Sequence, residues 1–340
     1  MPTRANGLRT TIAGVVDGFL DGWYTFDADK AFADFETDFP GFLYQPLNQE
    51  RPVDDPAAYL QSVRDGDIKE FRELRWANIE HDDLGDFLWA YIDLVQHAVG
   101  HDGSESRGAY RASLFMARLG DGWKVVHYHE SAQPYALRPR RVGGPAPSRP
   151  EEKAPSLDTL AAIKRAQETA AASHGDDPET ASLRMLETFV FGWEALDIEM
   201  AYSWWDRHYD SHIYLALEIA SPIRSWADIK TYRLWQLEDR LATGTRWDWK
   251  APLEREDRRV QTLGDDLVLV YSNLHARGLT PHEPEPNEQQ VPYFTYRVSW
   301  LMRRSAGQWR IIHYHESRPT PGPTEVLTLG VHPSGAPGQP

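Results

Sequence analysis

Two short segments of the chain each place a pair of histidines on one face of an expected strand. His127 and His129 are separated by one residue, and so are His313 and His315. Because successive side chains of a strand point to opposite faces, the two imidazoles of each pair should lie about 7 Å apart on the same face. Such a pair could move protons or bind a polar ligand, and it could supply part of a metal site.

The two histidine pairs belong to an internal repeat. Residues 123–131 read Trp-Lys-Val-Val-His-Tyr-His-Glu-Ser, and residues 309–317 read Trp-Arg-Ile-Ile-His-Tyr-His-Glu-Ser. Further matches extend toward the start of each copy: Tyr110-Arg111 with Tyr296-Arg297, Leu84-Gly85-Asp86 with Leu263-Gly264-Asp265, and Phe19, Gly22-Trp23 and Asp27 with Phe189, Gly192-Trp193 and Asp197. A unit of roughly 130 to 140 residues has the size of a domain, so the chain is predicted to hold two copies of one domain.

The repeated segment is expected to be the second strand of a hairpin. Its β-branched and aromatic residues favour a strand, and Gly120-Asp121-Gly122 or Ser305–Gln308 provides the turn before it. If Leu119 lies opposite Trp123, the register gathers one polar set on one sheet face of each repeat. The set is Arg111, Ser113, His127, His129 and Ser131 in the first repeat, and Arg297, Ser299, His313, His315 and Ser317 in the second.

The opposite sheet face carries apolar side chains in both repeats. Simple alternation assigns Val126 and Tyr128 to this face in the first copy, and Ile312 and Tyr314 in the second. These residues are candidates for a contact between the two repeats, whereas the polar set is expected to line a pocket.

A hairpin that ends Trp-x-x-x-His-x-His-x-Ser, after a strand with Arg and a small hydroxyl residue, resembles a known family. It is similar to the SnoaL-like and calcium/calmodulin-kinase-association-type branch of the NTF2-like superfamily. The resemblance implies an α+β fold of two tandem cones, each a bent antiparallel sheet around helices with a pocket inside. Members commonly pair through their sheets, so a pseudo-dimer within one chain is expected. The superfamily contains isomerases, dehydratases, cyclases, epoxide hydrolases and non-catalytic scaffolds, so no single reaction follows.

The composition is that of a soluble globular protein. Of 340 residues, 41% are hydrophobic and 26% are charged, and the net charge is −15. This negative charge argues against binding to nucleic acid or to an anionic membrane surface. The absence of Cys excludes disulfides and thiolate metal sites. No apolar run approaches the roughly 18 residues of a membrane span, and no signal peptide is evident, so a cytoplasmic location is expected.

Segments rich in Pro and Gly predict where the domains begin and end. We expect domain 1 over residues 1–138, a linker and connecting helix over 139–177, domain 2 over 178–320 and a disordered tail over 321–340, because residues 139–156 and the tail are rich in Pro and Gly. The expected elements of the first domain are a helix over 8–24, a strand over 42–46, a helix over Pro56–Val63, strands over 70–81 and 86–98, and a loop over 99–107.

Three further features of the chain lead to expectations. Asp27 and Asp197 are expected to cap short helices. The long Pro-rich loop 279–292 is a candidate lid over the second pocket. His208 and His212 are expected on the surface at a helix end.

Tyr91 and Asp93 could complete a site for proton transfer. On the neighbouring strand they could face the histidines, with Asp93 as a base and the Tyr91 phenol stabilising an enolate, as in ketosteroid isomerase of the same superfamily. The second repeat has Tyr271 and Asn273 at these positions. An amide is no base at neutral pH, so the first pocket is the better candidate for this chemistry. Arg111 could hold a substrate carboxylate or pair with Asp93 internally.

The leading hypothesis is therefore a cofactor-independent enzyme of the isomerase, dehydratase or cyclase type, acting on a small anionic molecule. The expected catalytic residues are Asp93, His127, His129 and Tyr91; the expected substrate-binding residues are Arg111, Ser113, Ser131, Arg297, Ser299, His313, His315 and Ser317. Two alternatives stay open. One is a non-catalytic binding or scaffold module, and the other is a metal-dependent enzyme such as an oxygenase, with His127, His129, His313 and His315 as ligands. The expected state is a monomeric pseudo-dimer or a homodimer.

Overall fold

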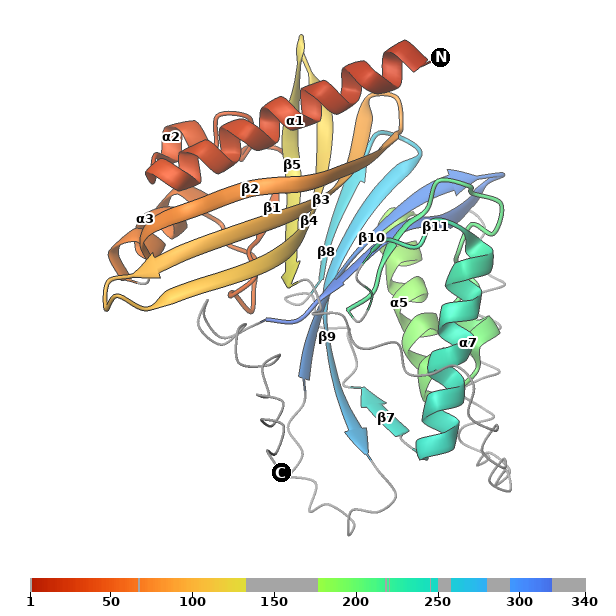
Figure 1. The fold of residues 1–340 in the computed structure, drawn as a ribbon. Helices are drawn as coiled ribbons and strands as arrows, with labels where there is room; N and C mark the ends of the chain where they lie inside the picture. The colour runs from red at the N-terminus through yellow and green to blue at the C-terminus, as the bar shows by residue number, and fades with distance from the viewer. Residues whose placement is uncertain are drawn as a thin grey trace, which may run out of the picture. The chain divides into compact units, whose positions relative to one another are not determined.

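A computed structural model describes most of both repeats. The described residues are 2–66, 68–132, 177–217, 219, 221–244, 246–249, 258–279 and 294–319. They belong to two compact units, the first within residues 1–135 and the second within residues 136–318, and both are drawn in Figure 1. The predicted α+β fold with two tandem domains is confirmed. The predicted linker, connecting helix and tail, and most of the loop 279–292, lie outside the described residues.

The first unit is a five-stranded sheet with three helices (Figure 1). Its elements are α1 (Pro2–Thr25), α2 (Ala28–Ala31), β1 (Leu43–Gln45), α3 (Pro56–Gly66), β2 (Ile68–Asp83), β3 (Phe87–Gly100), β4 (Glu105–Leu119) and β5 (Gly122–Ala132). The strand order is β1-β5-β4-β3-β2, with β1 parallel to β5 and the other pairs antiparallel. The predicted helices and strands are present. The predicted loop 99–107 is shorter, because β3 and β4 continue into it.

The second unit repeats this order with one strand divided. Its elements are α5 (Pro178–Glu194), α6 (Ile198–Ala201), β6 (Ile213–Leu215), α7 (Trp226–Thr243), β7 (Arg246–Trp249), β8 (Arg258–Leu263), β9 (Leu267–Leu279), β10 (Phe294–Ser305) and β11 (Gln308–Ser317). The strand order is β6-β11-β10-β9-β7, and β8 also pairs with β9. Two short strands thus take the place of the long β2. Helix α7 has 18 residues, against 11 in α3.

The repeated Gly and Asp near the start of each copy form the same helical corner. The Asp27 carboxylate accepts a hydrogen bond from Lys30 N at 3.1 Å and so caps α2, as predicted. Asp197 caps α6 in the same way. A Cβ on Gly22 would lie 2.1 Å from the Ala31 backbone nitrogen, so only glycine lets the two helices approach this closely.

The helices of each unit cover one face of its sheet. In the first unit, Phe19 of α1 packs with Leu114 of β4 and Tyr128 of β5 in one buried cluster. Phe189 of α5 packs with Tyr314 of β11 in the second. None of the helices in the described part of the chain is both long enough and apolar enough to span a bilayer.

A β-bulge in β5 sets the register of the repeated motif. Arg118, not Leu119, lies opposite Trp123, so the predicted pairing at the turn was wrong by one residue. Val126 is the extra residue of the bulge, and beyond it Phe115 lies opposite His127 as predicted. The predicted pairs Ser113–His129 and Arg111–Ser131 are confirmed, and so are their counterparts Ser299–His315 and Arg297–Ser317.

The bulge also changes which residues share a face. Val125, not Val126, joins Tyr128 in the core beneath the helices, and Ile311, not Ile312, joins Tyr314. The two tyrosines, predicted to meet the other repeat, pack instead inside their own domains. The pseudo-dimer itself stays a prediction.

Candidate functional site

The predicted polar set comes together, but on the sheet face opposite the helices. Arg111 Nε donates to Ser131 Oγ at 3.2 Å, and Arg297 Nε donates to Ser317 Oγ at 2.9 Å. Both arginines are fully buried. The cavities of the two domains lie on the other face, where Glu130 of β5 or Tyr314 and Glu316 of β11 line them together with helix residues. The polar set therefore lines neither of these two cavities, which lie on the apolar face that the helices cover. Its catalytic and binding roles stay predictions.

Tyr91 and Asp93 belong to the same face and contact each other. The Tyr91 hydroxyl donates a hydrogen bond to the Asp93 carboxylate, and Asp93 lies opposite Arg111 in the register. Burial, with a further contribution from Asp93, raises the pKa of the Tyr91 phenol. In the second unit the Tyr271 hydroxyl donates to Asn273 Oδ1 at 2.8 Å. The two repeats therefore keep one tyrosine bond whether the acceptor is a carboxylate or an amide.

The four motif histidines are buried, and the structure defines the protonation of two of them. Burial lowers the pKa of His127 to about 3, so its imidazole is uncharged near neutral pH. His313 Nδ1 accepts the Ile213 backbone N–H at 3.0 Å, which places any single ring proton on Nε2. The ring centroids of His127 and His129 are 6.5 Å apart. Among the described residues, no three His, Asp or Glu side chains are grouped so that they could hold a metal ion. The absence of a cofactor stays a prediction.

His212 was predicted on the surface and is instead buried. Its two ring nitrogens lie 2.8 Å from the Ile312 carbonyl oxygen and 2.9 Å from the Asp206 carbonyl oxygen. His212 therefore ties the segment before β6 to the bulge of β11. His208 is exposed, as predicted.

The first domain holds a cavity of about 90 Å³ between its helices and its sheet. Aromatic and aliphatic side chains form most of the wall, and three polar residues interrupt it. The residues that define its chemistry are Trp23, Tyr44, Tyr59 and Tyr110 among the aromatics, and Asn48, Gln96 and Glu130 among the polar ones. Apolar walls with a few polar groups are typical of small-molecule sites.

Glu130 is the carboxylate of this cavity, and it comes from the repeated motif itself. Its Oε1 accepts the Tyr128 hydroxyl at 2.7 Å, and its Oε2 accepts the Leu47 backbone N–H at 2.9 Å. The sequence did contain a signal for this placement. The apolar stripe of residues 8–24 has to pack against the more apolar sheet face, and that face carries Tyr128 and Glu130.

Two tyrosine rings stack on each other next to Glu130. The rings of Tyr44 and Tyr128 lie 5.0 Å apart at an interplanar angle of 15°. Burial raises the pKa of both phenols, and the nearby Glu130 charge raises it further, so both hydroxyls stay protonated. The Trp23 indole lies close enough to influence the Tyr44 pKa, although its N–H makes no hydrogen bond within the described residues.

The equivalent cavity of the second domain is smaller, about 40 Å³, and Arg233 lies in it. The guanidinium carbon of this buried side chain lies 4.9 to 5.8 Å from the centroids of five aromatic rings, those of Trp193, Tyr202, Tyr214, Tyr232 and Tyr314. Arg233 Nη2 is 4.0 Å from Glu316 Oε2, and Nη1 donates to Gln236 Oε1. The second cone is therefore occupied by a cation of its own chain.

Arg233 in α7 and Val63 in α3 occupy equivalent positions in their helices. The Asp55 carboxylate accepts the Ala58 backbone N–H at 2.9 Å at the start of α3. Ser225 caps α7 by accepting Asp228 N at 3.1 Å. Val63 and Arg233 both follow eight residues after these capping residues, and each lines the cavity of its domain. A valine leaves the first cone open where an arginine fills the second.

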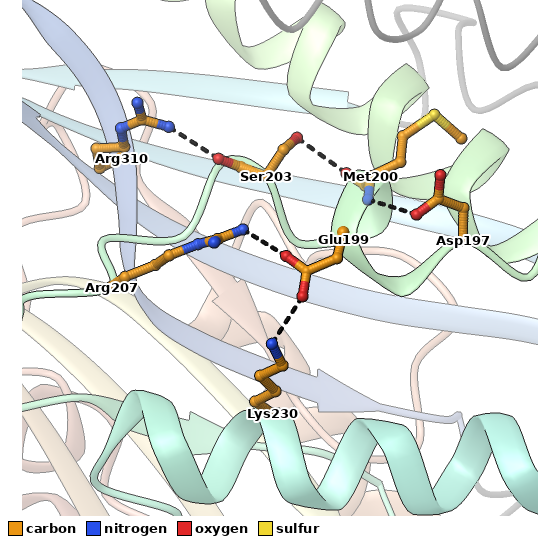
Figure 2. A network of polar contacts seen from close by, with 7 residues as sticks. All are labelled: Asp197, Glu199, Met200, Ser203, Arg207, Lys230 and Arg310. Atoms are coloured by element: carbon orange, nitrogen blue, oxygen red, sulfur yellow. Dashed lines mark hydrogen bonds and ion pairs between the residues drawn. The ribbon is translucent and has the colours of Figure 1, made fainter.

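A polar network holds the N-terminal half of α7 in place (Figure 2). Glu199 of α6 accepts Lys230 Nζ at 2.7 Å and Arg207 Nη2 at 2.9 Å. Arg310 of β11 donates to the Ser203 carbonyl oxygen at 2.8 Å. Lys230 precedes Arg233 by three residues on α7, so the network helps to fix the helix that carries the internal cation.

Comparison with known proteins gives the family. Residues 56–136 and 232–321 both match the SnoaL-like domain, and together they make up half of the chain. The protein therefore belongs to the SnoaL-like domain family and contains two NTF2-like domains in tandem. No curated protein matches the chain.

Similar solved structures each correspond to one domain. One is an NTF2-like superfamily protein from Salmonella enterica, with 20% identity, a TM-score of 0.34 and coverage of 38% of this chain and 92% of that protein. Another is an NTF2-like protein of unknown function from Pseudomonas putida, with 17% identity, a TM-score of 0.30 and coverage of 39% of this chain and 91% of that protein.

Proposed function

We propose that the first domain binds a small organic molecule in its cone and transfers a proton on it without a cofactor. The observation that carries the proposal is the carboxylate of Glu130 in the wall of an otherwise mainly apolar cavity. A carboxylate surrounded by apolar groups is well suited to accept a proton from carbon or oxygen. The expected reaction class is isomerisation, dehydration or cyclisation, as the superfamily resemblance implies.

The surrounding side chains support this role for Glu130. The bonds from Tyr128 and Leu47 hold its carboxylate in one orientation. The amides of Asn48 and Gln96 in the same wall offer N–H groups to an oxygen that gains negative charge during the reaction. Arg111, the predicted anion-binding residue, lies on the other sheet face, so it gives no reason to expect an anionic substrate in this cavity.

The test compares the two domains in one chain. The full-length protein would be incubated in D₂O with a panel of small carbonyl compounds and alcohols, and deuterium uptake would be followed by NMR. Glu130→Gln should lower the exchange rate at least about a hundredfold, because it removes the base. Glu316→Gln, the same change in the filled cone, should leave the rate within about twofold. Equal losses in both variants would contradict the proposal.

A non-catalytic binding function is the second candidate. It is favoured by the fact that both carboxylate oxygens of Glu130 already accept hydrogen bonds within the protein. Saturable binding in the first cone, without deuterium exchange for any compound that binds, would select this function. The cytoplasmic location and the monomeric or homodimeric state remain predictions.

A further inference from the structure

The second cone shows which kind of group fits this architecture. Its interior holds a guanidinium among five aromatic rings, with the Glu316 carboxylate 4.0 Å away. The negative face of an aromatic ring attracts a cation, most strongly where water is excluded. Arg233 is 4% exposed, so the attraction acts in a site from which water is largely excluded.

The first cone repeats part of the wall of that site, whereas Tyr202 and Tyr232 correspond to Phe32 and Ser62 in the first repeat. The matching residues are Trp23 for Trp193, Tyr44 for Tyr214, Tyr128 for Tyr314 and Glu130 for Glu316. The geometry of the two tyrosine pairs is also the same, with centroid separations of 5.0 Å and 4.8 Å and interplanar angles of 15° and 10°. In each domain the hydroxyl of the second tyrosine of the pair donates a hydrogen bond to the glutamate.

The first cone differs in its charge. Among the described residues that line its cavity, none is Lys, Arg or His, whereas Arg233 and Arg240 line the second. Glu130 is thus the charged residue of this cavity wall, and the aromatic faces around it favour the same sign of partner. An anionic ligand would meet the Glu130 charge in an apolar environment, which disfavours it strongly.

We propose that the molecule bound in the first cone carries a compact organic cation, an alkylammonium or a guanidinium, at the position that the Arg233 guanidinium takes in the second cone. This inference rests on the proposed function, that the first cone binds a small molecule. The cation lies beside Trp23 and Tyr44 and faces Glu130, while Tyr128 stacks on Tyr44. The ligand class is therefore an amine, a quaternary ammonium or a guanidine, in place of the anion that the sequence suggested.

The test uses ligand pairs that differ only in charge. Choline and its neutral isostere 3,3-dimethylbutan-1-ol form one pair, and benzylamine and benzyl alcohol form another; agmatine and benzoate complete the panel. Binding to the full-length protein would be measured by calorimetry and by the shift in melting temperature. At least one cation should bind about thirtyfold more tightly than its neutral partner. Benzoate should not bind.

Two variants place the binding in the first cone. Val63→Arg puts a guanidinium at the position of Arg233 and should abolish cation binding by internal competition. Val63→Met, uncharged and also longer than valine, controls for the loss of space. Should Val63→Arg fail to fold, Glu130→Gln replaces it and should weaken cation binding at least about tenfold while changing the affinity of the neutral isostere by less than twofold.

The outcomes separate the two proposals. Cation-selective binding that Val63→Arg abolishes supports both. Equal binding of charged and neutral partners, or binding of benzoate, overturns the cation proposal and leaves the proposed function standing if Val63→Arg still abolishes it. Absence of any binding that responds to Val63→Arg, or to Glu130→Gln in its place, overturns both.

Discussion

The two cones share one scaffold and differ in what fills it. In the first, Val63 leaves a cavity of about 90 Å³ beside Glu130. In the second, Arg233 reaches in from the same helical position, and about 40 Å³ remains. The tryptophan, the stacked tyrosines and the glutamate are common to both.

The difference teaches how a repeat can keep a binding wall without keeping a binding site. A carboxylate beside aromatic rings attracts a group of positive charge, because the carboxylate and the ring faces are both negative. The second domain supplies this group within its own chain, and its cavity is largely closed. The first domain keeps the wall and leaves the space for a molecule from solution.

The largest effect is expected from removing the internal cation. Arg233→Met should lower the free energy of unfolding of the second domain by about 3 kcal/mol, because Glu316 loses its buried partner and five rings lose their cation. Urea denaturation would measure the change. Adding Glu316→Gln should recover part of it, as a double-mutant cycle would show. If Arg233→Met costs less than about 1 kcal/mol, the arginine does not hold the second cone together.

A smaller and equal effect in both domains is expected at the helical corner. Gly22→Ala would place a Cβ 2.1 Å from Ala31 N, and Gly192→Ala would place one 2.3 Å from Ala201 N. Each should cost about 2 kcal/mol through overpacking, measured by the same denaturation. Similar costs would show that the scaffolds are equivalent despite their different interiors. A loss confined to one domain would contradict the matched corner.

An effect that depends on pH concerns the sheet face that the two repeats keep most alike. The pKa of His127 is about 3 in the folded protein and 6.5 when the group is free in water. Between these values the unfolded chain binds the proton and the folded protein does not, so stability falls as the pH falls through this window. The contribution is about 1.4 kcal/mol per pH unit.

The variant His127→Gln isolates this contribution. Its stability should fall less steeply than that of the unchanged protein between pH 6 and 4 when both are followed by denaturation at several pH values. Parallel curves for the two proteins would mean that His127 takes up its proton in the fold.

The sequence predicted the repeat, the strands and the partners of the motif histidines, but not the face on which the cavity lies. The predicted pairing of His129 with Ser113 is correct because two errors cancelled: the turn pairing was wrong by one residue, and the bulge at Val126 offsets it. The bulge could not be predicted, because an extra residue in a strand leaves no pattern of its own in a run of β-branched residues.

The side of the sheet that faces the cavity depends on where the helices pack. Polar residues on one strand face suggested a pocket, yet the apolar stripe of α1 covers the other face, which carries Tyr128 and Glu130. Val63 was expected only as the last residue of a helix. Only the comparison with Arg233, at the same distance from a helix cap, shows that it keeps the first cone open.

The parallel pairing of β1 with β5 has a consequence for the order of folding. The Leu47 N–H and the Glu130 carboxylate that it binds are 83 residues apart, and the antiparallel hairpins between them need much shorter loops to close. Loop-closure entropy therefore favours the hairpins first and β1 last. The cavity wall is completed in that final step, when Tyr44 meets Tyr128. A ligand of the first cone is then expected to slow unfolding more than it speeds folding, because the surface that it needs is completed last.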